Sequence, residues 1–401
     1  MCCHSLTVEY NPGCPTFVDC SRLALPDNDT DSRQNLVHVA AKRPQQSVHS
    51  IFSTIGLPSI LTIAAERDAV LHVGNWTQLM TNGSLVISVE NANHSIPVEA
   101  HGFRLNRMFR LFDANDDADI SKVSPSNVQS IDLVNVRWSS PNITLSNDSI
   151  NTQICTNTDG TNVLSSMFGS GRLCITASVF ASDGRDVRPP NLLHSARSVQ
   201  VQLELQSLSL NKLGKQTRFA VELVFMSTAN GTTEKVVQQS IDDEYTPGIF
   251  KTVDVLYADH LGYCRWKPVA YKQQTRSRST LTQTTSSDLT SHVPYAPACG
   301  ALLYYFNGNC SGTQCDALNV TFGYPKDGFY TSTMYSVWSM STGMGVPPQD
   351  AMRTCLVTLI VAAVLLPVLA VLLCVLVCVC LRRRAHSADQ AALLPDSDDD
   401  A

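Results

Sequence analysis

The sequence has little charge for its length. Asp, Glu, Lys and Arg make up 16% of its 401 residues, whereas a soluble protein has about 25%. The net charge of −6 and the pI near 5.9 exclude the clustered positive surface that nucleic-acid binding requires. Much of the deficit comes from one segment, because residues 355–381 contain no charged side chain.

That charge-free segment is apolar except at Thr358 and Pro367. A bilayer core of ~30 Å needs about 20 helical residues. The sequence therefore predicts one transmembrane helix over 355–381, followed by a short tail over 382–401.

The sequence also lacks the common catalytic motifs. It contains no Gly-x-Ser-x-Gly elbow, no His-Glu-x-x-His motif and no phosphate-binding loop. No pair of histidines has the spacing of metal ligands. We therefore expect no catalytic residues, no metal site and no cofactor.

Two acidic segments could in principle carry chemistry. Residues 113–119 begin like a calcium loop, but Ala118 and Ser124 stand where the EF-hand needs Gly and a bidentate Glu, so an acidic loop is favoured. Asp242, Asp243 and Glu244 offer paired carboxylates. They leave open a hydrolase or a carbohydrate-binding module as an alternative, although a hydrogen-bonded turn before Pro247 is favoured.

Three signals orient the chain in the membrane. Arg382, Arg383 and Arg384 directly follow the apolar segment, and a Lys/Arg excess marks the cytosolic side. All nine Asn-x-Ser/Thr sequons precede the segment, and neighbouring turn or strand-end residues should keep them reachable: Asn28, Asn75, Asn82, Asn93, Asn142, Asn147, Asn230, Asn309 and Asn319. These signals predict a type I protein, with the long N-terminal region in the lumen.

Cysteines provide the third signal. Six lie scattered among strand-like segments without a zinc-type spacing, as disulfide cysteines do in an oxidising compartment: Cys155, Cys174, Cys264, Cys299, Cys310 and Cys315. Proximity in sequence favours the pairs Cys155–Cys174, Cys310–Cys315 and Cys264–Cys299, with Cys14–Cys20 as a fourth. A type I protein also needs an N-terminal signal, and since none precedes Glu9, we expect the start to be incomplete.

The region before the apolar segment has the patterns of β-strands. Residues 199–205 and 219–225 alternate apolar with polar side chains, and further short strand-like runs lie at 58–64, 84–89, 131–138, 173–180, 249–257, 301–306 and 317–322. The fold class predicted is mainly β. We expect two antiparallel β-sandwich-like luminal domains, 1–190 and 191–350, divided near Arg188-Pro189-Pro190, plus the C-terminal transmembrane helix. The Ser/Thr-rich residues 275–291 are expected to form an exposed loop.

The tail contains a sorting pattern. Asp389 precedes Leu393 and Leu394 at the spacing of an acidic dileucine signal, which clathrin adaptors bind as an extended peptide. The two leucines are the only large apolar side chains in a tail rich in Asp, so packing does not explain them.

Several strings together resemble the glycosylated lysosomal membrane protein family. The most specific is Ser240–Phe250, and the others are Arg188–His194, Trp266–Tyr271, Leu318–Gly323 and Trp338–Pro348. The chain departs from the family in its cysteine set, in lacking a signal peptide and in lacking the tyrosine-based tail signal of the mammalian members.

The resemblance implies a lysosomal membrane protein without enzymatic activity. Members of the family associate through the luminal domain with a major facilitator superfamily transporter, which they shield from proteolysis and help to retain in lysosomes. An adhesion protein at the cell surface is the remaining alternative.

Overall fold

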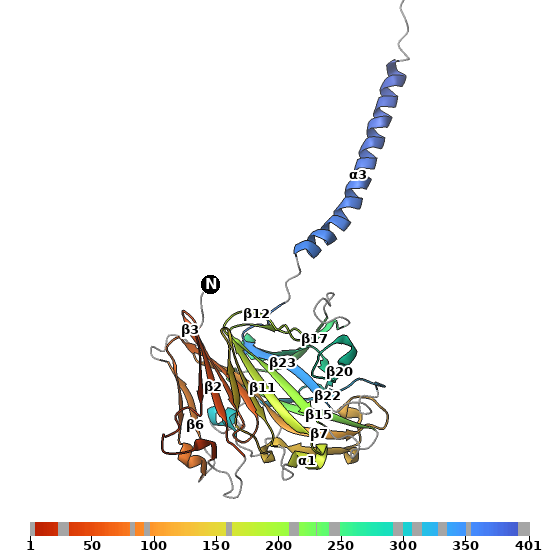
Figure 1. Cartoon of the computed structure of the whole chain (residues 1–401). Coiled ribbons are helices and arrows are strands. Elements are labelled where there is room, and N and C mark those ends of the chain that lie inside the picture. The colour runs from red at the N-terminus through yellow and green to blue at the C-terminus, as the bar shows by residue number, and fades with distance from the viewer. Residues whose placement is uncertain are drawn as a thin grey trace, which may run out of the picture. The chain divides into compact units, whose positions relative to one another are not determined.

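The computed structural model describes residues 5–22, 32–80, 85–91, 97–157, 163–207, 216–229, 231–239, 249–291, 300–306, 315–327, 335–349 and 354–391. The chain divides into two units, Met1–Pro348 and Gln349–Ala401. The first is a β-sandwich and the second contains the long apolar helix α3 (Figure 1).

The first sheet of the sandwich is antiparallel, and β15 (Thr217–Ser227) is one of its interior strands. Its strands follow in the order β1 (Ser5–Tyr10), β2 (Leu36–Lys42), β3 (Gln46–Ser53), β4 (Ser59–Glu66), β7 (Glu99–Phe112), β15 and β22 (Cys315–Phe322). β8 (Val128–Asp132) pairs with the second half of β7, and β21 (Thr290–Ser291) pairs with β22.

The second sheet is also antiparallel. It has the order β9 (Asn142–Leu145), β10 (Ser149–Cys155), β11 (Arg172–Phe180), β14 (Ser198–Gln206) and β23 (Ser336–Met344). β18 (Gly262–Trp266) and β19 (Val269–Tyr271) pair with the two halves of β23, and β17 (Lys251–Leu256) and β16 (Glu234–Gln239) extend beyond β18. Four further strands form two short hairpins, β5 (Val70–Gly74) with β6 (Val86–Glu90) and β12 (Gly184–Arg185) with β13 (Leu193–His194).

The two sheets pack face to face over one apolar core. Val201 and Leu203 of β14 lie in the same buried cluster as Val221 and Leu223 of β15, as the alternation predicted. Trp338 of β23 lies edge-on to Phe322 of β22, their ring centroids 6.4 Å apart. The mainly antiparallel β architecture is therefore confirmed.

The expected division into domains at 190/191 is wrong. β11, which precedes that boundary, pairs along its length with β14, which follows it, and β7 pairs likewise with β15. Both sheets of the sandwich therefore contain strands that precede Pro190 in the sequence and strands that follow it. The prolines instead lie in the short connection between β12 and β13.

The Ser/Thr-rich segment is not an exposed loop. It contains a 3₁₀ turn (Arg278–Thr280) and β20 (Leu281–Ser286), which pairs with β19 of one sheet and then with β22 of the other. Thr282 and Thr284 are buried. Threonine is β-branched and its methyl packs well on a pleated surface, so a threonine-rich run can form a strand where serine alone would not.

A second apolar cluster lies on the outer side of the first sheet. It contains Val224 and Met226 of β15 and is covered by α2 (Ala301–Tyr305), by the β5–β6 hairpin and by the 3₁₀ segment Trp76–Met80. The expected strand at 301–306 is therefore a short helix, whose Ala301 and Leu302 face this cluster.

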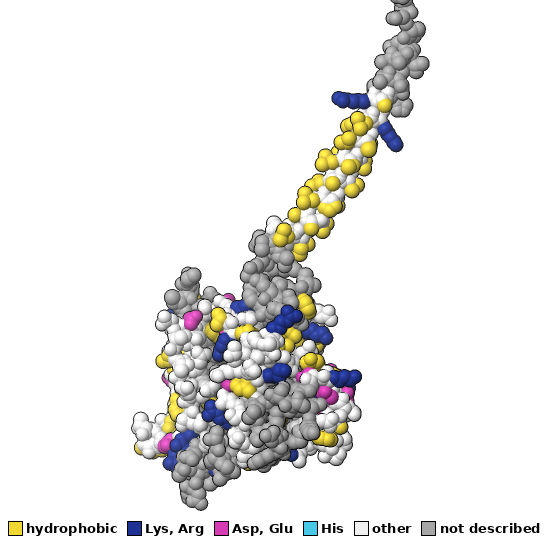
Figure 2. Space-filling model, turned by 45° about the vertical axis from the view of Figure 1, so that its right-hand side comes forward, with side chains coloured by type: hydrophobic (Ala, Val, Ile, Leu, Met, Phe, Trp, Pro, Cys, Tyr) yellow, Lys and Arg dark blue, Asp and Glu magenta, His cyan; other side chains and the backbone are white. Residues whose placement is uncertain are grey.

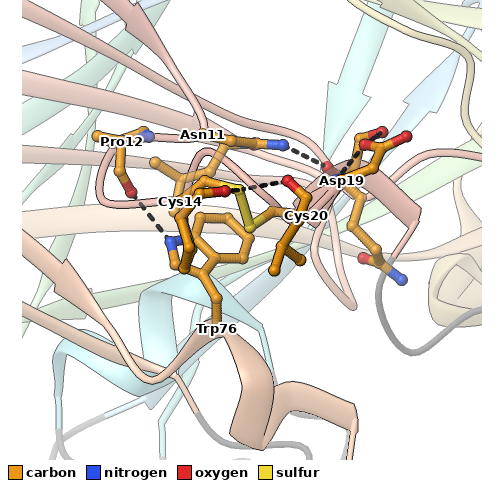
Figure 3. Close-up of a disulfide and its surroundings, with 11 residues drawn as sticks. Asn11, Pro12, Cys14, Asp19, Cys20 and Trp76 are labelled. Atoms are coloured by element: carbon orange, nitrogen blue, oxygen red, sulfur yellow. Dashed lines mark hydrogen bonds between the residues drawn. A yellow bond between two sulfur atoms is a disulfide. The ribbon is translucent and has the colours of Figure 1, made fainter.

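The N-terminal segment completes that cover. The Trp76 indole N–H donates to the carbonyl oxygen of Pro12 at 3.0 Å, and the Cys14–Cys20 disulfide lies beside the indole ring (Figure 3). Cys20 is buried in the same cluster. We call this cover, formed by residues 12–20, the β5–β6 hairpin, Trp76–Met80 and α2, the outer lid.

The second unit contains one helix able to cross a membrane. α3 runs from Thr354 to Ala391, and its Thr358–Ala385 portion is uniformly apolar up to the arginines at its end. Figure 2 shows hydrophobic side chains around this helix and basic ones near its far end. Pro367 lies inside it, which membrane helices tolerate.

Candidate functional site

The outer face of the second sheet carries a polar cleft of about 470 Å³. It lies over β9, β10, β11 and β14, whose inward side chains belong to the core, so its floor consists of the outward side chains. The described residues that line it are Asn142, Thr144, Asn151, Gln153, Thr176, Arg188, Gln202, Glu204, Gln274, Arg276 and Tyr335.

Strand register places several of these side chains in one row. Asn142 pairs with Gln153, Gln153 with Thr176, and Thr176 with Gln202. Gln202 in turn pairs with Ser339 on β23. The row thus crosses five strands, and we call it the amide row. Gln153 donates to Thr176 across it at 3.3 Å.

Arg276 closes one end of the cleft. Its guanidinium donates to Gln202, to Ser339 at 3.3 Å and to the carbonyl oxygen of Pro189 at 2.7 Å. Burial, followed by the nearby charge of Arg188, lowers the pKa of Arg276. This residue belongs to the Ser/Thr-rich segment and lies in the connection between β19 and β20.

Glu204 is the one carboxylate among the described residues of the cleft wall. It is buried and accepts hydrogen bonds from Gln206 at 2.7 Å and from Gln202. Burial, followed by the bond to Glu204, raises the pKa of the Tyr335 phenol, so Tyr335 stays a donor. This chemistry suits a ligand rich in hydroxyl and amide groups, because the wall offers many neutral donors and acceptors.

The calcium-like acidic loop surrounds an arginine. Arg218 of β15 is fully buried, and its Nε donates to Asp113 at 2.7 Å. Its Nη2 contacts Asp116 and, at 2.9 Å, Asp327. The carboxylate of Asp113 also accepts the backbone N–H groups of Asp117 and Ala118, which fixes the loop. The guanidinium therefore supplies the positive charge around which this loop folds.

Two buried histidines on β2 and β3 form a hydrogen-bonded chain. Ser47 donates its hydroxyl proton to the carbonyl oxygen of Glu66 at 2.6 Å, so it accepts from Nε2 of His49 at 2.9 Å. Nδ1 of His49 then accepts from Nε2 of His38 at 3.0 Å. With both rings neutral, Nδ1 of His38 carries no proton. It makes no hydrogen bond to the described residues and lies 3.8 Å from a carboxylate oxygen of Glu9.

Burial keeps these histidines neutral in acid. It lowers the pKa of His38 to about 4 and that of His49 to about 3, with the charge of His38 adding to the effect on His49. Burial also lowers the pKa of His101, on β7 beside Tyr257, to about 3.

The structure describes four of the nine sequon asparagines. Asn75, Asn142 and Asn147 are exposed, and Asn142 lines the cleft. Asn319 lies in the middle of β22 and is half-buried, so the expected position beside a turn is wrong for it. Asn28, Asn82, Asn93, Asn230 and Asn309 lie outside the described residues.

The structure contains two of the expected disulfides, Cys14–Cys20 and Cys155–Cys174. The pair Cys264–Cys299 is wrong, because Cys264 is a buried thiol that donates to Thr342 at 3.3 Å, and burial raises its pKa to about 12. Cys299 and Cys310 lie outside the described residues, so the pair Cys310–Cys315 stays a prediction.

Two further predicted sites, the acidic segment 242–244 and the sorting signal of the tail, lie partly or wholly outside the described residues. Asp242, Asp243 and Glu244 are not among the described residues, and neither are Leu393 and Leu394. Asp389 lies in the last turn of α3. The amide row was missed altogether, although the outward polar positions of 200–204 and 151–153 carried a signal for it.

We expect Arg218→Met to destabilise the sandwich by about 3–5 kcal/mol, because the substitution leaves Asp113 and Asp327 buried without their cation. Urea denaturation of the full-length protein, followed by tryptophan fluorescence, measures the loss. Lys122→Met is the control, since the exposed pair of Lys122 with Asp119 contributes less than about 1 kcal/mol. Equal midpoints for the two variants would contradict the assignment.

We expect the free energy of unfolding to fall as the pH falls from 6.5 toward 4. A buried histidine with a lowered pKa stays neutral while its unfolded counterpart, with a pKa of 6.5, takes up a proton. The stability is therefore fully present above pH 6.5, and each such histidine removes roughly 1.4 kcal/mol per pH unit below it.

His49→Gln should make this decline shallower by about that amount, whatever its effect at pH 7. Urea midpoints measured across this pH range give the slope. His72→Gln is the matched control because the His72 ring is exposed. A slope for His49→Gln as steep as that of the unaltered protein would rule out the linkage.

A family model described as glycosylated lysosomal membrane protein matches residues 35–386. Three curated relatives carry the same name. The protein from Danio rerio is 29% identical over 362 residues, which cover 88% of this chain and 84% of the relative. The one from Bos taurus is 28% identical over 339 residues, with 82% and 80% covered, and the one from Homo sapiens is 25% identical over 327 residues, with 80% and 77% covered.

The family match includes both the sandwich and the apolar helix α3. The resemblance seen in the sequence is thereby confirmed. The chain belongs to the glycosylated lysosomal membrane protein family, whose members are lysosomal membrane glycoproteins.

Proposed function

We propose that the protein is a non-enzymatic accessory subunit of a lysosomal transporter of the major facilitator superfamily. In this proposal the sandwich lies in the lumen, associates with the transporter and shields its luminal loops from proteases. Family membership carries the proposal, and the arrangement of sequons, sandwich and helix supports it.

The type I orientation is supported by charge and by modification sites. Three arginines follow the apolar portion of α3, and the nine sequons all precede it. The two disulfides lie in the same unit as the sequons, as they would in an oxidising compartment.

The sandwich itself is suited to a protease-rich lumen. Proteases cleave segments that open locally into an extended chain. The central strands are paired on both sides, and Arg265 holds the end of the unit by donating to the carbonyl oxygen of Pro348 and to both carboxylate oxygens of Asp254. N-glycans on exposed asparagines such as Asn75 and Asn147 would exclude proteases sterically.

The chain length favours a partner in the same membrane. Only residues 349–353 separate Pro348 from α3, and five residues span at most about 17 Å when extended. So short a connection favours a partner whose luminal loops emerge from the same membrane.

We expect a transporter of this superfamily to co-purify with the protein from isolated lysosomes in mild detergent. Deleting the protein should shorten the half-life of that transporter, and inhibitors of lysosomal proteases should restore it. A chimera that keeps residues 1–353 on an unrelated apolar helix should rescue the half-life, because the proposed contact is luminal. Recovery of the protein alone, with an unchanged transporter half-life, would contradict the proposal.

We further expect the tail to direct the protein through clathrin adaptors. Leu393→Ala combined with Leu394→Ala removes the two apolar side chains that dock in an adaptor groove, so the protein should accumulate at the cell surface. Surface biotinylation in cells lacking the transporter measures this. Asp398→Ala with Asp399→Ala is the control, since these residues lie beyond the motif. Unchanged delivery to lysosomes would place the signal elsewhere.

A further inference from the structure

The sequon asparagine Asn142 is a member of the amide row. It lies on the outermost strand of the second sheet, and both Asn142 and the sequon hydroxyl residue Thr144 line the cleft. They are two residues apart on one strand, so they face the same side of the sheet. A group attached to Nδ2 of Asn142 would thus begin at the rim of the cleft.

The next sequon provides a contrast within the same hairpin. Asn147 lies between β9 and β10, is exposed and does not line the cleft. A group attached there extends into solvent. The two sites are five residues apart, so both asparagines enter the lumen at nearly the same time and both belong to the same hairpin.

The cleft has unused hydrogen-bonding capacity. The side-chain amides of Asn151 and Gln274 bond to no other residue in the described parts of the chain, and Gln153 uses its amide N–H only toward Thr176. Tyr335 and Glu204 also line the cleft, but they are already bonded to each other, and Glu204 accepts from Gln206 as well. Amides, hydroxyls and an aromatic ring are the groups that bind the hydroxyl and acetamido groups of amino sugars.

The size of the cleft also suits such a ligand. Its volume of about 470 Å³ lies within the range of roughly 300–1,000 Å³ typical of small-molecule sites. The wall is polar and carries one acidic and two basic side chains among the described residues, so it suits a neutral ligand better than a strongly charged one.

We propose that the cleft receives the proximal N-acetylglucosamine residues of a glycan carried by Asn142, so that this glycan is held against the second sheet. Attachment is the usual transfer, in which Nδ2 loses a proton, bonds to the first sugar and displaces the lipid pyrophosphate carrier. It occurs during translocation, before the cleft has formed. The inference rests on the luminal orientation of the proposed function.

The first test compares release of the two glycans from the full-length, folded protein by peptide N-glycosidase. Release converts the asparagine to aspartate, and glycopeptide mass spectrometry reads this change at each site. We expect release at Asn142 to be about tenfold slower than at Asn147, the ratio that two net hydrogen bonds to the protein would produce. The difference should vanish after denaturation.

The second test blocks the cleft and leaves the sequon intact. Asn151 faces the cleft from β10, so Asn151→Trp should fill it and expel the sugars. Release at Asn142 should then become as fast as at Asn147. Asn75 carries a third exposed sequon on a different element and serves as the matched reference in every sample.

The outcomes separate the inference from the proposal on which it rests. Equal native release at Asn142 and Asn147 in the unaltered protein overturns the inference and leaves the luminal orientation in place. An unoccupied Asn142 beside an occupied Asn147 also overturns it. No glycan at any sequon overturns the orientation. The unaltered protein gives the decisive ratio even when Asn151→Trp does not fold.

Discussion

The burial of β15 on both faces is the constraint on which the sandwich depends. Its inward residues form the core between the sheets, so its outward residues must be covered by something other than a second sheet. Toward one end, Val224 and Met226 lie under the outer lid. Farther along, Arg107 donates to Glu222 at 2.9 and 3.0 Å, and Asn106 joins them because a bulge displaces the register of β7 there. Arg218, at the other end, meets the acidic loop.

The sequence predicted well which side chains of the strands face inward. It predicted poorly what covers the side chains that face outward. Alternation in 199–205 and 219–225 shows which side chains point inward, because it depends only on the local period of a strand. What covers the outward side chains depends on segments far away in sequence, such as Trp76, Asp327 and α2. For the same reason the proline pair at 189–190 suggested a domain boundary, while the pairing of β11 with β14 across it could not be read locally.

The cleft also depends on residues far apart in sequence, so the local pattern did not predict it. Each member of the amide row was visible as a polar position in a strand, but the row exists only through the register of β9, β10, β11, β14 and β23. Arg276 contacts it from the connection between β19 and β20, in a segment whose composition predicted an exposed loop. Nearby cysteines, by contrast, could be paired from proximity alone: Cys155 and Cys174 lie opposite each other on β10 and β11. Proximity failed for Cys264, which faces the core.

The buried guanidinium groups of Arg218 and Arg265 are each paired with carboxylates. Three buried imidazoles change little in acid. Burial lowers the pKa of His38 to about 4 and those of His49 and His101 to about 3, so they remain neutral near pH 5. Between pH 7 and pH 5 these imidazoles thus keep the same protonation. The free energy of unfolding nevertheless falls in acid, because histidines of the unfolded chain take up protons that the buried histidines do not. The disulfides within the outer lid and between β10 and β11 stabilise the folded chain, because they limit the unfolded ensemble at every pH.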